Sequence, residues 1–151
     1  MKSTKQLQTY DLLSVLQGVQ SAPPGDMKWA EHCARQQAVI LRLESPRGTL
    51  DSIATLADVT GIAIELVDDI PVAGTAFQTP NGWRIHVSTS LAPAAQVHIA
   101  LHELKHILDH GHRLKTRDSA FSHIDYEHLA EFFAKNALAN YENDQQEKEE
   151  S

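Results

Sequence analysis

The residues best suited to chemistry lie in one short segment, His102-Glu103-Leu104-Lys105-His106. Residues four apart lie one turn apart on the same face of a helix, so His102 and His106 can direct a ring nitrogen at one metal ion. Glu103 then lies beside the metal, where its carboxylate can take a proton from an attacking water. This HExxH spacing predicts a Zn²⁺ cofactor with Glu103 as the general base.

Two further histidines extend the pair into a ladder with a spacing of four residues: His98, His102, His106 and His110. Only the central pair has a glutamate directly after its first histidine, and only that pair falls in the middle of the predicted helix. Each step of four residues drifts by about 40° around a helix, which turns the outer histidines away from the central face. The alternative to a catalytic zinc site is a structural or incidental histidine ladder.

A catalytic zinc site needs a third protein ligand and an open fourth position. One candidate is His112, because its distance from His102 matches the longer motif HExxHxxGxxH. That motif has Gly where Asp109 stands, and a later methionine turn, whereas both methionines of this chain precede the site.

The other candidates are Glu127 and Glu131, one turn apart on a later predicted helix. One would bind zinc and the other would hold a ligand histidine, and this second solution is preferred.

The motif helix is predicted over residues 93–110, with Gly111 at the position of a C-terminal cap. Helical patterns also cover residues 5–19, 26–43, 50–59 and 125–140, with Asp26 as an N-cap and Gly61 as a stop signal. Alternating or β-rich segments at residues 62–67, 74–78 and 83–87, with a turn signal at 80–82, predict strands. The expected fold class is α+β: N-terminal helices, a small antiparallel-type sheet of two or three strands, the motif helix, and a C-terminal helix that supplies the third ligand.

The 151 residues, 42% hydrophobic and 22% charged, have the composition of a single globular domain. We expect one metallopeptidase domain at 1–141, with a helical element at 1–48 and a catalytic core at 49–141, followed by a disordered acidic tail at 142–151. The net charge is −7, much of it in that tail, so we expect no direct nucleic-acid partner. With no apolar run long enough for a membrane and Cys33 as the only cysteine, expected to be buried, we expect a cytoplasmic protein.

Residues 50–139 resemble the ImmA/IrrE family of zinc peptidases, small cytosolic proteins common in bacteria and their mobile elements. The resemblance rests on a helix-to-strand entry at 56–64, a hairpin at 74–77 and 83–87, the active helix at 99–108, and Glu127-x-x-Ala130-x-x-Phe133-Ala134. It implies that Glu127 is the third ligand, whereas Glu131 stands where the family usually has Asp or Asn. Two features depart from the family: Lys105, expected on an outward helix position, replaces a frequent Gly, and residues 137–140 replace its Leu-Leu-Met-Pro ending.

The resemblance implies a zinc-dependent endopeptidase that cuts a protein substrate, typically a DNA-binding transcriptional repressor. Glu103 would move the proton of the attacking water to the leaving amine. The strand at 83–87 is expected to lie antiparallel to the substrate. An oxyanion stabiliser is also expected, and His123, Tyr126 and His128 remain equal candidates.

The rival interpretation is a non-catalytic zinc-containing sensor or antirepressor that acts by protein binding. An intact Glu103 argues against it, because a binding module has no use for a general base. A purely structural zinc site would instead have four protein ligands.

A basic cluster follows the motif helix. Its residues, Arg113, Lys115 and Arg117, are expected in a solvated loop that could meet an acidic substrate. The oligomeric state and the role of the first 50 or so residues stay open.

Overall fold

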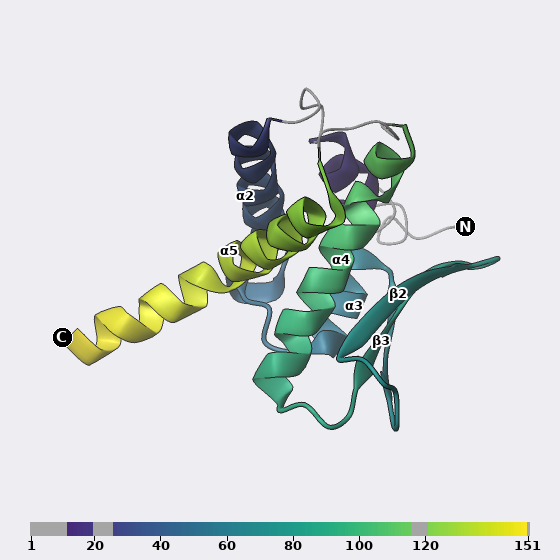
Figure 1. The fold of residues 1–151 in the computed structure, drawn as a ribbon. Helices are drawn as coiled ribbons and strands as arrows, with labels where there is room; N and C mark the ends of the chain where they lie inside the picture. Colours follow the sequence, from purple (N-terminus) through teal and green to yellow (C-terminus); the bar gives the residue numbers. More distant parts are fainter. Residues whose placement is uncertain (1–11, 20–25, 116–120, 151) are drawn as a thin grey trace, which may run out of the picture.

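Figure 1 shows the computed structural model of the chain, which describes residues 12–19, 26–115 and 121–150. The predicted α+β class is confirmed. Residues 12–18 are helical. After them come α2 (Met27–Leu43), a short 3-10 turn η1 (Pro46–Gly48), α3 (Ile53–Thr60), β1 (Ala63–Val67), β2 (Gly74–Thr79), β3 (Gly82–Ser88), α4 (Pro93–Lys115) and α5 (His123–Glu150).

Local signals explain where α2 and α3 begin and end. The side chain of Asp26 accepts a hydrogen bond from the backbone N–H of Trp29 and caps α2, as the sequence predicted. Ser52 caps α3 in the same way, so this helix begins at Ile53, three residues later than expected. Gly61 ends α3 in the left-handed conformation, with φ of 75°.

The three strands form one sheet in the order β1-β3-β2, with β3 in the centre. The hairpin of β2 and β3 is antiparallel, and its turn is closed by Thr79 opposite Gly82. The sheet is mixed rather than purely antiparallel, because β1 pairs with β3 in parallel. Segment patterns predict strands but not their pairing partners, and here the second strand of the hairpin, not the first, lies next to β1.

Both long C-terminal helices extend beyond their predicted ends. Gly111 does not cap α4, because its φ is not positive and the helix continues through it to Lys115. α5 continues past the expected end near Asn140 to Glu150, through the segment that its composition predicts to be a solvated tail. That segment is rich in Glu, Gln and Lys, which favour helix.

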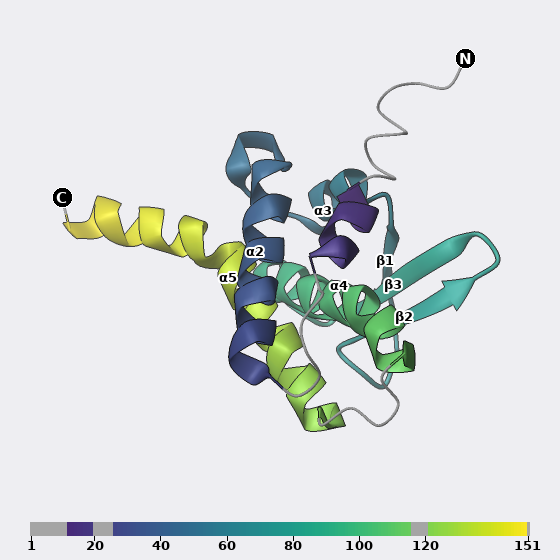
Figure 2. The same ribbon diagram turned by 90° about the horizontal axis from the view of Figure 1, so that it is seen from above.

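The helices form layers on one face of the sheet. α4 packs against β2 and β3 on one side and against α5 on the other, and α2 packs against α5 (Figures 1 and 2). Ile85 and Val87 of the central strand are fully buried, as are Leu101 and Leu104 of α4. The helix that carries the motif, α4, is thus packed between the sheet and α5, and this packing determines which of its faces remains accessible.

The N-terminal element contributes to the same core. Leu12 and Leu16 belong to the buried cluster that includes residues of α4 and α5. On α2, the small side chains Ala30 and Ala34 are buried, and so is Cys33, as predicted. Small residues allow two helices to approach closely, so α2 can hold α5 firmly in place.

Lys105 corrects one prediction: its side chain does not point outward but is fully buried. Its ammonium donates hydrogen bonds to Oδ1 of Asp109 and to Oε1 of Gln37, both at 2.7 Å. Gln37 in turn donates to the carbonyl of Leu16 at 2.8 Å. The second carboxylate oxygen of Asp109 is buried and finds no partner among the described residues. This network ties α4 to α2 and to residues 12–18.

Within the described stretches of the chain, none of the helices has the length and apolar character that crossing a lipid bilayer requires.

Candidate metal centre

Two packed helices bring the predicted ligands together. α4 presents His102 and His106 one turn apart, and α5 crosses it with Glu127 and Glu131 also one turn apart. The histidine side chains are largely buried, with 12% and 18% of their surface exposed, whereas that of Glu127 is 42% exposed. The cluster therefore lies at the floor of an opening and not in a closed interior.

The ligand atoms converge on a single point. The Nε2 atoms of His102 and His106 lie 3.2 Å apart, and each lies 2.9 Å from an oxygen of Glu127. A tetrahedral ion about 2.0–2.1 Å from its ligands would set neighbouring ligand atoms roughly 3.3 Å apart. The observed spacings are close to that value, so the three side chains could together bind a metal ion.

The hydrogen bonding of His102 also fits a cation at this point. Its Nδ1 lies 2.7 Å from a carboxylate oxygen of Glu131, which can only accept, so Nδ1 carries the proton. In the neutral form that binds metals, Nε2 then has a lone pair directed at the Glu127 carboxylate, 2.9 Å away, and a cation between these two acceptors would be bound by both.

Glu131 is held by two histidines at once. Besides His102, it contacts Nε2 of His98 at 3.0 Å. Burial raises the pKa of Glu131, but the hydrogen bonds from His98 and His102 outweigh it and leave the pKa below its ordinary value. The carboxylate therefore stays charged and orients the ring of His102, which is the position that the sequence predicted for one of the two glutamates.

Glu103 lies next to the cluster in a half-buried position. Burial raises its pKa, as does the nearby charge of Glu127, while His102 and a hydrogen bond from the backbone N–H of Ala76 oppose the shift. Burial also lowers the pKa of His106, which favours the neutral ring that binds metals. A carboxylate whose pKa is raised toward neutrality is suited to accept and return a proton.

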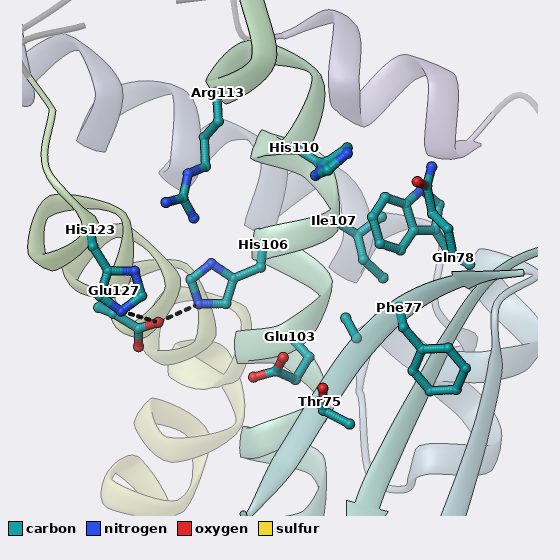
Figure 3. A pocket seen from close by; sticks show the side chains of 12 residues that line it. Thr75, Phe77, Gln78, Glu103, His106, Ile107, His110, Arg113, His123 and Glu127 are labelled. Carbon is teal, nitrogen blue, oxygen red and sulfur yellow. Dashed lines mark ion pairs between the residues drawn. The ribbon is translucent and has the colours of Figure 1, made fainter. Parts of the chain in front are cut away.

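These groups open onto a cleft of about 390 Å³ between β2, α4 and the start of α5 (Figure 3). His106, Glu103 and Glu127 lie along its floor and side. Its other walls are formed by Thr75, Ala76, Phe77, Gln78, Trp83, Ile107, His110, Arg113 and His123. The cleft is large enough to admit a few residues of a peptide but not a folded protein.

The strand beside this cleft is β2, and the expectation for residues 83–87 was wrong. Those residues form β3, whose backbone is paired on both sides and cannot bind a substrate chain. β2 is an edge strand, and the N–H of Ala76 is directed away from β3, toward Glu103. Gly74 allows this close approach, because a Cβ there would collide with Ile99 and lie 3.2 Å from the carbonyl of His86.

The other predicted ligand, His112, does not join the cluster. α4 is continuous through Asp109, so the chain does not turn back toward the metal as the longer motif requires. Six residues after His106, His112 lies about 120° away on the helix surface. Of the outer histidines in the ladder, His98 binds Glu131, and the ring of His110 packs edge-on against Trp83 at 5.0 Å.

The three candidate oxyanion stabilisers lie in different places. His123 lines the cleft, with its Nε2 at 3.8 Å from Glu127. Tyr126 is 97% buried beneath Arg113, and His128 pairs with Glu31 of α2 at 2.8 Å. Of the three, only His123 lines the cleft.

Arg113 is the cleft residue whose position the sequence did not reveal. It was expected in a solvated loop, but it lies on α4, and its guanidinium rests on the ring of Tyr126 at 4.5 Å from the centroid. Arg113 continues one helix face that also carries Glu103, His106 and His110. This spacing could not be used because the helix was expected to end at Gly111. Lys115 ends the same helix, and Arg117 lies outside the described residues.

No protein-family model, curated protein or solved structure matches this chain.

Proposed function

We propose that this chain is a zinc-dependent endopeptidase of the kind found in the ImmA/IrrE family, which its motifs resemble. The observation that carries the proposal is the convergence of His102, His106 and Glu127, with Glu103 beside them in an open cleft. Three protein ligands and an accessible side are what a catalytic zinc site requires, whereas a structural site would have four protein ligands. Two imidazoles and one carboxylate are also a common ligand set of zinc peptidases.

In this proposal the three ligands would hold Zn²⁺, which supplies a Lewis acid for the scissile carbonyl and lowers the pKa of water toward about 7. Glu103 takes the proton of the attacking water and gives it to the leaving amine. Its half-buried carboxylate, held by the N–H of Ala76, is positioned for both transfers. Glu131 keeps the ring of His102 in place, and His123 faces the position where negative charge develops.

The edge strand β2 supplies a surface for the substrate backbone. An extended peptide can pair with such an edge through main-chain hydrogen bonds and still place a peptide bond beside Glu103. The substrate would then be a flexible segment of a protein, because pairing with an edge strand requires an extended chain. A DNA-binding repressor with an exposed linker fits this description and is the substrate class that the family resemblance implies.

The experiment that tests the proposal compares the zinc-loaded wild type with Glu103→Gln on a pool of denatured proteins, with cleavage sites read by mass spectrometry. The variant keeps the ligands and should hold the same zinc, but it should lose cleavage by at least about a hundredfold. Equal cleavage by both proteins would contradict the role of Glu103. If neither protein cleaves while a biological response survives in Glu103→Gln, the sensor or antirepressor interpretation replaces the peptidase.

A further inference from the structure

The cleft has two chemically different ends. Glu103 and Glu127 lie at the metal end, and both are carboxylates. Arg113 and His110 line the other end, and His123 lies next to Glu127, with its Nε2 3.8 Å from that carboxylate. Figure 3 shows the Arg113 side chain extending into the space above His106 and His123, on the side away from Glu103.

The contacts of the Arg113 side chain favour ligand recognition. Its guanidinium stacks on Tyr126, whose ring is fixed because only 3% of that residue is exposed. A guanidinium on an aromatic face keeps its N–H donors free at the edge, where they can bind a carboxylate with two parallel hydrogen bonds. Arg113 itself remains exposed to the cleft. These features make it a preformed site for a carboxylate and not a random surface charge.

The direction of β2 relates the direction of a bound peptide to the two ends of the cleft. Gly74, at the start of β2, approaches Ile99 and Glu103, whereas Trp83, which pairs with Gln78 near the end of β2, contacts His110. β2 and α4 therefore run in the same direction along the cleft. A substrate antiparallel to β2 enters at the Arg113 end with its N-terminal side and leaves past Glu103 with its C-terminal side.

The distance limits which substrate residue can reach the guanidinium. Arg113 follows His106 by seven residues, about 10 Å along the helix axis. An extended peptide advances about 3.3 Å per residue, so this separation corresponds to roughly three substrate residues. Because the Arg113 side chain reaches back toward His106, its partner belongs within three residues of the scissile bond.

We propose that Arg113 determines specificity by selecting an acidic side chain within three residues on the N-terminal side of the scissile bond. This inference rests on the proposed function, since it needs a peptide in the cleft. A terminal carboxylate of the substrate would reach the same guanidinium only if the peptide ran parallel to β2. The two sources of the carboxylate are therefore separated by the polarity of the bound peptide.

The test uses acetylated tripeptide hydroxamates on the zinc-loaded protein, with binding measured by calorimetry. The hydroxamate occupies the metal, so the peptide lies on the N-terminal side of the scissile position. Glu is compared with Gln at each of the three positions. At one of them Glu should bind about fivefold more tightly than Gln. Arg113→Gln should abolish that difference, and Arg113→Lys should keep most of it.

Arg84→Gln is the matched control, because Arg84 pairs with Glu65 on the sheet and does not line the cleft. This variant should leave the difference between the Glu and Gln peptides unchanged.

A chain without zinc would refute the proposed function itself. Equal binding of Glu and Gln peptides by a zinc-loaded chain would overturn only the role of Arg113. A hydroxamate with its carboxylate on the C-terminal side completes the set. An Arg113-dependent gain with that probe alone would overturn the proposal in favour of a terminal carboxylate.

Discussion

Glu103 occupies a position where its charge is unfavourable to the metal-free fold. Its carboxylate is half buried, and Glu127 adds a second negative charge nearby. The nearby His102 and the N–H of Ala76 offset this only in part, so the pKa of Glu103 stays above its ordinary value. A carboxylate whose pKa is raised by folding lowers the stability of the fold at neutral pH.

The metal-free protein should therefore become more stable when Glu103 is replaced by Gln. A raised pKa means that the folded chain binds this proton more tightly than the unfolded chain, so stability falls as the pH rises above about 4.5. Glu103→Gln removes this loss and keeps an oxygen that can accept from Ala76. Its melting temperature in EDTA should exceed that of the wild type at pH 7, and the gain should shrink below pH 4.5. Glu65→Gln, on the exposed sheet edge, should show no gain. A wild type at least as stable as Glu103→Gln at pH 7 would refute this.

Glu131 should control the affinity for zinc without being a ligand. It holds the ring of His102 at 2.7 Å, so Glu131→Gln leaves three ligands in place but loosens one of them. Zinc affinity should fall roughly 10–100-fold, measured by competition with a chelator, while saturating zinc should still give one ion per chain. Complete loss of zinc at saturation would mean that Glu131 is itself a ligand.

At the scale of the elements, signals that act within a few residues were predicted well. Asp26 and Gly61 bound their helices as expected, because a cap depends only on its own turn. The parallel pairing of β1 and the burial of Lys105 depend on which elements meet in space, and neither leaves a local pattern. Gly111 is the instructive error: it looks like a cap, but packing of α4 against the sheet and α5 carries the helix through it.

Two glycines should respond in opposite ways to the same substitution. A Cβ at Gly74 would push β2 away from α4, so Gly74→Ala should lower the free energy of unfolding by about 1–3 kcal/mol. Gly111 lies within α4, and nothing lies within 4 Å of the position of its Cβ. Gly111→Ala should therefore stabilise the protein by about 0.5–1 kcal/mol. Urea denaturation measures both, and equal effects would show that β2 does not approach α4 as described.

The buried pair in α4 should behave as a single unit. Lys105→Met leaves the Asp109 carboxylate buried without its cation, so unfolding should become easier by about 3–5 kcal/mol. Lys105→Met combined with Asp109→Leu removes both charges and should recover most of that loss. Urea denaturation of the two single variants and the double variant gives the coupling. Additive losses would contradict a shared network.

At the scale of the whole molecule, α5 links the metal cluster to the N-terminal element. Its first turns carry Glu127 and Glu131, and it packs against α4 and α2 (Figure 2). Residues 12–18 join the same core through Leu16 and reach α4 through Gln37 and Lys105. The first part of the chain therefore helps to hold the helix that completes the cluster.

How much of the site was predictable follows from this arrangement. His102, Glu103 and His106 lie on one helix, so their spacing in the sequence is also their spacing in space. Glu127 and Glu131 come from another helix and were candidates because they follow the motif one turn apart, and only the family resemblance chose Glu127 between them. Arg113 was expected in a loop because its place in the cleft depends on where α4 ends, and the presence of His123 in the cleft depends on the packing of α5 against α4.

The most direct test of the proposed metal centre is the zinc content per chain, measured by mass spectrometry for the wild type and for Glu127→Ala under identical loading. Glu31→Ala serves as the control, because Glu31 lies on α2 and pairs with His128, away from the cluster. We expect one zinc in the wild type and in the control, and a clear loss in Glu127→Ala. One zinc in all three proteins, or none in the wild type after reconstitution, would contradict it.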